Sequence, residues 1–399
     1  MKVVFISNYY NHHQSPFSEK MSELTGGEYW FIATEKMSDE RKSMGWGKEV
    51  LPSFVLQIYE SDTTRQFAEN LINSADIVIF GLSGWNNFKL IQPRLKANKI
   101  TFRYSERLYK TGLPWYRIPI QAIKLWLTGG RYRNMYLLCA SAYAAQDYAR
   151  TGAYIGRTYK WGYFPRTKKY DVDDLMSRKL SVTSGWKHPR VSILWAGRLI
   201  GWKHPDVSIE LAASLKEKGY SFRMSIIGNG EMEQQLRTMI EKKNLSDCVE
   251  MLGAMSPEKV REYMEKADIY LFTSDFNEGW GAVLNESMNS GCAVVASHAI
   301  GSVPFLIRDG NNGLIYQNGN REQFESKVEL LLKNNEYRKQ LGINAYKSII
   351  SLWNADNASE RLMNLAQQLG KQGCGSELFD NGPCSDAKIL AEKWYDDSL

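Results

Sequence analysis

Short runs of apolar residues alternate with amphipathic stretches of helix length along most of the chain. In the first half these runs are continuous, and they predict strands at 2–7, 29–34, 76–81, 99–105 and 136–141. Buried strands of a parallel sheet have this pattern, because helices cover both faces of the sheet. The first half is therefore expected to be a doubly wound α/β domain.

The same alternation restarts in the second half. Strands are predicted at 191–197, 222–228, 249–253, 269–274 and 292–297, with helices at about 205–218, 231–243, 257–266 and 281–290. Residues 320–370 are mostly helical in pattern, and a loosely ordered tail is expected after them. Open α/β sheets bind ligands at the carboxyl ends of their strands, so a cleft between two such domains is expected to be the site.

A polar stretch without periodicity separates the two halves. The predicted organisation is an N-terminal Rossmann-like domain over 1–170, a linker over 171–188 and a C-terminal Rossmann-like domain over 189–355. Residues 356–399 are expected to form a helix that packs back toward the N-terminal domain, followed by the tail. A chain of 399 residues is too long for one ordinary core and fits two domains.

Composition and charge exclude several classes of protein. Apolar residues make up 43% of the chain and charged residues 24%, as in soluble globular proteins, and no apolar run reaches the about 20 residues of a membrane-spanning helix. The N-terminus has no small-residue cleavage site, so a cytoplasmic protein is expected. Five scattered cysteines without a CxxC pair predict neither a disulfide framework nor a structural metal site. A net charge of +6 suits nucleotide diphosphates but is too dispersed for nucleic acid.

The strongest chemical signal is the segment 273–297, TSDFNEGWGAVLNESMNSGCAVVAS. A predicted strand leads into a loop with Gly279 and Gly281, and a helix follows. Glycines at such a turn let a ligand approach the backbone, and the amides at the start of the helix favour anions or hydroxyls. Glu278 and Glu286 are then positioned to bind hydroxyls of a sugar and of a ribose, although glutamates at this spacing are also common on solvated helix faces.

Two further loops follow predicted strands. Arg198 and Lys203 lie in the first, where a guanidinium and an ammonium together suit a diphosphate, although two basic residues on an exposed loop are also a common arrangement. Gly228, Asn229 and Gly230 form the second, a glycine turn without the third glycine of G-x-G-x-x-G. This turn fits either a tight structural connection or a nucleotide contact.

Five pieces of the second half resemble, in order and spacing, the C-terminal domain of glycosyltransferase family 4, the retaining enzymes of GT-B fold. These pieces are GRLIGWKHPD, IIGNGEMEQQL, VEMLGAMSPEKVREYMEKADIYLFTS, NEGWGAVLNESMNSGCAVVAS and GSVPFLIRDGNNGLIY. The resemblance covers about 191–320, whereas the first half resembles the family only in its pattern. It implies two Rossmann-like doubly wound domains that face each other across a cleft.

The resemblance also implies an activity. A sugar would pass from a nucleotide-sugar donor to a carbohydrate or lipid-linked acceptor, as in bacterial surface polysaccharide or glycolipid synthesis, without a metal or other cofactor. Arg198 and Lys203 would neutralise the donor diphosphate, and Glu278 would lie against the donor sugar. The other implied donor contacts are the ribose contact of Glu286, the pocket lining by Gly228, and the backbone amides of Trp280 and Gly281.

The first half departs from the family at two places. Many members have a Gly-Gly loop after the first strand, where this chain has SNYYNHHQSPF, and a histidine after the strand that here ends at Ser105. Either Glu106 takes over that contact with the sugar, or His12 or His13 supplies it from the first loop. The missing glycine turn argues against a nicotinamide-dependent dehydrogenase. A GT-B-like nucleotide-sugar epimerase and a catalytically silent nucleotide-binding scaffold remain as alternatives.

One stretch of the first half, 102–133, is both basic and aromatic. It has seven basic residues against one acid, Glu106, with tryptophans and tyrosines between them. Such a stretch fits a packed helix with a solvated basic face. It also fits a surface that lies on an anionic membrane and brings a lipid-linked acceptor to the site.

Overall fold

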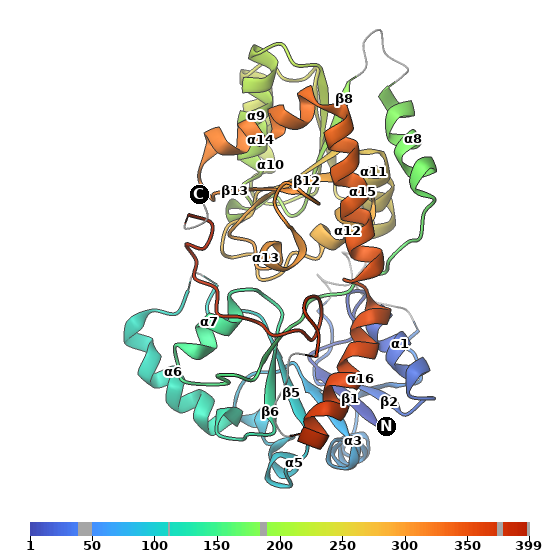
Figure 1. Cartoon of the computed structure of the whole chain (residues 1–399), viewed down its shortest axis with the longest axis vertical. Helices are drawn as coiled ribbons and strands as arrows, with labels where there is room; N and C mark the ends of the chain where they lie inside the picture. The colour runs from blue at the N-terminus through green and yellow to red at the C-terminus, as the bar shows by residue number, and fades with distance from the viewer. Residues whose placement is uncertain (39–49, 111, 184–189, 373–377, 397–399) are drawn as a thin grey trace. The chain divides into compact units, whose positions relative to one another are not determined.

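The chain folds into two compact α/β units. The computed structural model describes residues 1–38, 50–110, 112–183, 190–372 and 378–396. Unit 1 comprises Met1–Arg166 and Leu352–Glu392, and unit 2 comprises Thr167–Ser351 and Lys393–Leu399 (Figure 1). Each unit contains one parallel sheet with helices packed against it, so the predicted fold class is confirmed for both halves.

The sheet of unit 1 has seven parallel strands in the order β3-β2-β1-β4-β5-β6-β7. The strands are β1 (Val3–Ser7), β2 (Tyr29–Ala33), β3 (Val55–Gln57), β4 (Ile77–Phe80), β5 (Thr101–Ser105), β6 (Met135–Cys139) and β7 (Thr158–Lys160). Every residue of β1, β4 and β6 is buried, as their continuous apolar sequences predict. The strand order reverses between β1 and β4, which makes the loop after β1 a favourable place for a ligand.

The helices of unit 1 include one from the far end of the chain. They are α1 (Ser15–Leu24), α3 (Asp62–Ser74), α4 (Trp85–Phe88), α5 (Gln92–Lys96), η1 (Trp115–Arg117), α6 (Ile118–Leu125), η2 (Trp126–Gly130), α7 (Ala144–Ala149) and α16 (Ala355–Gln372). Helix α16 packs against α1, so the C-terminal helix lies in unit 1 (Figure 1).

The sheet of unit 2 has six parallel strands in the order β10-β9-β8-β11-β12-β13. The strands are β8 (Val191–Ala196), β9 (Phe222–Ile227), β10 (Val249–Gly253), β11 (Ile269–Phe272), β12 (Ala293–Ser297) and β13 (Leu314–Tyr316). The helices are α8 (Val172–Thr183), η3 (Gly201–Lys203), α9 (Pro205–Glu217), α10 (Glu233–Lys242), α11 (Pro257–Lys266), α12 (Val283–Asn289), α13 (Val303–Leu306), α14 (Arg321–Lys333) and α15 (Asn335–Ser351). The strand order reverses between β8 and β11, so the loops after these two strands flank the switch point of the sheet.

The two sheets contain three strands that the apolar pattern does not predict. These are β3, β7 and β13, each three residues long, and each lies at an edge of its sheet. Strands of three residues leave no long apolar run in the sequence, and this holds for β13 although its residues are buried.

The predicted linker over 171–188 is wrong for most of its length. Residues Val172–Thr183 form helix α8, which packs within unit 2 against α11, whereas 184–189 lie outside the described residues. Leu175 and Met176 are buried against Tyr346, and the Asp171 side chain accepts the Asp174 amide 2.9 Å away at the start of the helix. This capping aspartate and apolar pair indicate a helix that the many polar residues around them obscure.

The tail is also more ordered than the sequence predicts. Residues 378–392 pack on unit 1, where the Cys384 amide donates to the Lys160 carbonyl at 2.8 Å. Glu392 accepts a hydrogen bond from Arg107 at 2.6 Å, and Arg107 also binds Asp147 at 3.0 Å. Buried charged side chains of this kind need partners, and the C-terminal segment provides one of them. No helix within the described ranges combines the length and hydropathy that crossing a bilayer requires.

Candidate active site

The loop after β8 brings two cations to one tryptophan. Arg198 is exposed directly beyond the buried strand, and Lys203 ends the short helix η3. The Arg198 guanidinium carbon lies 5.8 Å from the centroid of the Trp202 ring, and Lys203 Nζ lies 4.8 Å from the same centroid. Two positive charges therefore lie beside one aromatic ring at the carboxyl end of the strand, in the loop where the sequence predicts an anion-binding site.

Lys203 is paired with Glu278 from the loop after β11. Lys203 Nζ lies 2.5 Å from Glu278 Oε2, and the two side chains are only 14% and 12% exposed. Ser274 donates a hydrogen bond from Oγ to the same carboxylate oxygen at 3.1 Å. The carboxylate thus has two donors in place and is held at the switch point of the sheet.

Further hydrogen bonds hold the two loops together. Thr273 Oγ1 donates to the Lys203 carbonyl at 2.7 Å and accepts from Trp195 Nε1 at 2.9 Å. The Asp275 amide donates to the Trp202 carbonyl at 3.0 Å. The position of the Lys203–Glu278 pair is therefore fixed by backbone contacts as well as by its own charges.

A second polar pair joins the same two loops. His204 Nε2 lies 3.3 Å from Asp275 Oδ2, and His204 has a left-handed backbone with φ 49°. The hydrogen bond with Asp275 raises the pKa of His204 above its ordinary value, against the opposing effect of burial. Burial alone would raise the pKa of Asp275, but hydrogen bonds from His204 and Asn277 lower it overall.

The glycine turn after β9 packs against the loop after β8. A Cβ atom at Gly228 would lie 1.8 Å from the Gly197 carbonyl oxygen, and one at Gly230 would lie 2.4 Å from the Leu199 carbonyl oxygen. Both glycines have positive φ, and the Asn229 carbonyl accepts the Leu199 amide at 2.8 Å. Of the two interpretations of this turn, the close backbone packing directly supports the structural one.

The loop between Glu278 and α12 is tightly packed. Trp280 is buried, and its Nε1 donates to Asn285 Oδ1 at 2.9 Å, while Gly279 beside it is also buried. Gly281 has φ +79°, and a Cβ atom there would lie 2.3 Å from the Phe272 ring. The glycine at 281 is therefore required by packing as well as by the turn.

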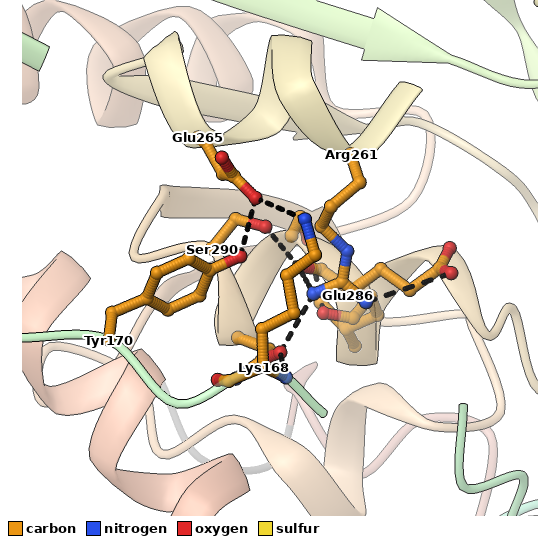
Figure 2. A network of polar contacts seen from close by, with 9 residues as sticks. Lys168, Tyr170, Arg261, Glu265, Glu286 and Ser290 are labelled. Atoms are coloured by element: carbon orange, nitrogen blue, oxygen red, sulfur yellow. Dashed lines mark hydrogen bonds and ion pairs between the residues drawn. The ribbon is translucent and has the colours of Figure 1, made fainter. Parts of the chain in front are cut away.

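Glu286 on α12 belongs to a polar network that also includes residues of α11 and of the segment before α8 (Figure 2). Its Oε1 lies 3.8 Å from Arg261 NH2, and Arg261 NH1 donates to Asn289 Oδ1 at 2.8 Å. Burial raises the pKa of Glu286, and the charge of Arg261 only partly offsets this. Glu265 completes the network, because it accepts hydrogen bonds from Lys168 at 2.8 Å and from Tyr170 at 2.6 Å (Figure 2).

In unit 1, Tyr163 brings together two residues that the sequence singles out. Its hydroxyl donates to Glu106 Oε1 at 2.9 Å, and its ring centroid lies 5.8 Å from that of His13. The His12 and His13 rings lie 3.8 Å apart. Burial raises the pKa of Tyr163 well above its ordinary value, so the hydroxyl stays a neutral donor toward the carboxylate.

Comparison with known proteins identifies a family match within unit 2 and the fold of the chain. Residues 177–348, all within unit 2, match the family model described as "Glycosyl transferases group 1". The whole chain resembles the structure of HepE from Anabaena, solved in complex with UDP, with a TM-score of 0.67 at 14% identity over 92% of this chain and 100% of that one. The fold is GT-B.

Two curated relatives match part of this GT-B chain. The amylovoran biosynthesis glycosyltransferase AmsK of Erwinia amylovora is 35% identical over 140 residues, which are 34% of this chain and 34% of AmsK. The putative colanic acid biosynthesis glycosyltransferase WcaL of Escherichia coli is 34% identical over 136 residues, which are 33% of this chain and 34% of WcaL. The chain thus spans about a third of the length of each relative.

The sequence pattern does not identify several residues of the candidate clusters in the two units. Thr273, Ser274 and Asp275 directly follow β11, and their position at the carboxyl end of a central strand was a usable signal. Tyr163 follows the edge strand β7, which has no apolar run, so nothing in its surroundings indicated a role.

Proposed function

We propose that this chain transfers a sugar from a nucleotide-sugar donor to an acceptor hydroxyl during synthesis of a surface polysaccharide or glycolipid. The observation that carries the proposal is the Lys203–Glu278 pair at the switch point of unit 2, inside the segment that matches the glycosyl transferases group 1 model. The names of AmsK and WcaL supply the biosynthetic setting, and the UDP complex of HepE supplies the first nucleotide to test.

The two cations of the β8 loop would bind the donor diphosphate. Arg198 is exposed and presents a planar fork of donors, and Lys203 supplies a compact charge beside it. Negative charge on the diphosphate grows as the sugar leaves, so cations already in place stabilise the transition state more than the bound donor. When Lys203 turns to the diphosphate, the Glu278 carboxylate becomes available to accept hydroxyls of the donor sugar.

The remaining donor contacts would come from neighbouring elements. Glu286 would accept a hydrogen bond from the ribose, and the turn at Gly228 would line the nucleotide pocket. The amides of Trp280 and Gly281 would meet the sugar or a phosphate. These contacts require no metal, because cationic side chains supply the positive charge at the diphosphate.

Transfer would retain the configuration of the sugar. The acceptor oxygen would bond to the anomeric carbon on the face from which the diphosphate oxygen departs. The proton of the acceptor hydroxyl would pass to the departing phosphate oxygen, so no protein nucleophile takes part. Glu106 and His13, which both lie next to Tyr163, would bind hydroxyls on the acceptor side. Nucleotide sugars are cytoplasmic metabolites, so the proposal places the protein in the cytoplasm, where it would meet a carbohydrate or lipid-linked acceptor.

A thermal-shift panel with UDP, other nucleoside diphosphates and their sugar conjugates tests the donor site. A ligand at about a hundred times its Kd stabilises the fold by about 2.7 kcal/mol, which raises Tm by a few degrees. We expect one nucleotide family to raise Tm in the presence of a chelator, and Lys203→Met to abolish that shift. No shift with any nucleotide would refute the donor site. Binding without turnover would favour the silent scaffold, and conversion of the donor without an acceptor would favour an epimerase.

A further inference from the structure

Helix α6 and its flanking turns carry large apolar side chains on their outer face. Trp115 is 78% exposed, Ile120 68%, Ile123 63% and Trp126 55%. We define the α6 surface as the exposed side chains of Trp115, Tyr116, Ile120, Ile123, Trp126 and Leu127. Figure 1 shows α6 at the outer edge of unit 1. Single exposed apolar residues are ordinary, whereas a run of six within one short segment marks an interaction site.

The amphipathic pattern of this helix is reversed. Among the residues of α6 only Leu125 is fully buried, although a surface helix normally turns its apolar face toward the core. Tyr116, Ile120, Ile123 and Leu127 are spaced by three or four residues, so they share one face of the helical segment, and that face is exposed. The expectation of a packed helix with a solvated basic face is therefore wrong for this segment.

The charges within the segment that contains the α6 surface have one sign. The sequence contains no aspartate or glutamate between Glu106 and Asp147. Exposed basic side chains border the apolar ones, at Arg117, Lys124, Arg131 and Arg133. Arg131 lies 5.0 Å from the ring centroids of both Trp126 and Tyr132, so the cation and the aromatic rings form one surface.

Two other arginines of the basic stretch have structural tasks. Arg103 donates to the Tyr154 hydroxyl at 3.0 Å, and Arg107 is buried in its ion pair with Asp147. Lys110 is exposed and lies 3.7 Å from Glu106. The other four exposed basic residues of the stretch are those named above. The α6 surface therefore combines exposed apolar side chains with exposed basic side chains near them.

We propose that the α6 surface binds the surface of an anionic lipid bilayer. Tryptophan and tyrosine favour the headgroup region, isoleucine and leucine enter the boundary with the acyl chains, and the lysine and arginines bind lipid phosphates. A second copy of the chain is a poorer occupant, because two cationic borders would repel each other. The proposal stands independently of sugar transfer, since it requires neither nucleotide nor acceptor.

Flotation of the full chain with lipid vesicles tests the proposal. We expect binding to vesicles that contain phosphatidylglycerol and much weaker binding to vesicles of phosphatidylcholine alone. The double variant Ile120→Ser/Ile123→Ser should reduce the partition coefficient about a hundredfold, from about tenfold for each side chain removed from the lipid. Lys124→Gln/Arg131→Gln should reduce it about thirtyfold on anionic vesicles, and added salt should have a similar effect.

Ile389→Ser is the matched control, because Ile389 has the same 63% exposure as Ile123 but lies in the C-terminal segment. This control should bind vesicles as the wild type does, and all variants should keep the wild-type Tm. Equal binding to neutral and anionic vesicles, or equal binding by the α6 variants and the wild type, would overturn the proposal. A dimer in solution that only the isoleucine double variant dissociates, together with no vesicle binding, would assign the surface to a second copy instead.

Discussion

Lys203 and Glu278 lie 75 residues apart in the sequence, yet their charged atoms are 2.5 Å apart in the structure. Each follows one of the two neighbouring strands between which the strand order of the unit 2 sheet reverses. Such a point is where parallel α/β sheets bind ligands, because the two connecting chains leave in opposite directions and open a space. The pair therefore holds a cation and a carboxylate ready at the position where a donor would enter.

Neutralising either partner should reduce transfer without unfolding the chain. On the proposed function, Lys203→Met removes a charge that would stabilise the leaving diphosphate, so we expect kcat/KM to fall by about 10²–10³-fold. Glu278→Gln keeps the diphosphate cations, so we expect transfer to be lost while UDP still binds. Steady-state kinetics and isothermal titration with UDP measure the two effects separately.

Lys216→Met is the matched control for the lysine variant. Lys216 forms an ion pair with Asp247 at 2.6 Å, but both side chains are more exposed than those of the site pair. This variant should transfer sugar at the wild-type rate, because an exposed pair contributes little. An equal loss of activity in Lys216→Met and Lys203→Met would contradict a specific role for Lys203.

The apolar pattern predicts the central strands of both sheets because these strands are buried on two faces. The edge strand Leu314–Tyr316 is too short to leave such a signal, although its residues are buried. The sequence of helix α8 predicts a linker because its exposed side is rich in charge, and the burial of Leu175 and Met176 in the fold reveals its apolar face. The apolar pattern of the sequence therefore predicts the central strands of the sheets, but it does not predict the short edge strands or helix α8.

The sequence places Lys203 and Glu278 correctly at the ends of two strands, but their ion pair depends on which strands are neighbours. The role of Gly228 shows the same limit. A missing third glycine left two interpretations open, and the approach of the Gly197 carbonyl, which supports the structural one, is a long-range contact. Spacing along the chain does not contain this information.

Gly228→Ala should destabilise unit 2 strongly. The new methyl group would clash with the Gly197 carbonyl oxygen, and the residue would keep φ +141°. Backbone strain of about 1–3 kcal/mol and overpacking of about 1–3 kcal/mol act together, so we expect the free energy of unfolding to fall by about 3 kcal/mol or more. Urea denaturation measures this change.

Gly219→Ala is the control that introduces backbone strain without a steric clash. Gly219 has φ +79°, but a Cβ atom there would meet nothing within 4 Å, so we expect a loss of only about 1–2 kcal/mol. Similar losses in the two variants would mean that the turn after β9 relaxes and that its close packing is dispensable.

Glu286→Gln should weaken nucleotide binding without lowering stability at neutral pH. Burial raises the pKa of Glu286, so the folded state binds its proton more tightly than the unfolded state does. This contribution to stability is fully present below the unfolded pKa and is lost as the pH rises through the folded pKa. Glutamine cannot ionise and so avoids this loss of stability, and we expect the variant to have a Tm at pH 7 that equals or exceeds that of the wild type. The difference in Tm between variant and wild type should become smaller as the pH approaches 4.

The same variant should lose about tenfold in affinity for UDP, because a hydrogen bond from the ribose to a charged acceptor is replaced by a neutral one. Glu250→Gln is the control, since Glu250 is exposed and pairs with Arg223. That change should leave UDP affinity unaltered. If Glu286→Gln binds UDP as the wild type does, Glu286 serves only the network with Arg261.

Tyr163→Phe tests whether the cluster of unit 1 acts in transfer. The change removes the hydroxyl that donates to Glu106 at 2.9 Å, so the carboxylate loses its fixed position, and we expect kcat to fall about tenfold with unchanged affinity for UDP. Glu106→Gln should cost more, because the acceptor group itself loses its charge. Tyr154→Phe is the control, since the buried Tyr154 hydroxyl accepts from Arg103 at 3.0 Å and, within the described residues, has no hydrogen bond with Glu106 or His13. The Tyr154 hydroxyl also donates to Met135 Sδ at 3.5 Å, so Tyr154→Phe should lose at least as much stability as Tyr163→Phe. A similar fall in kcat in the two variants would show that the contact between Tyr163 and Glu106 is only structural.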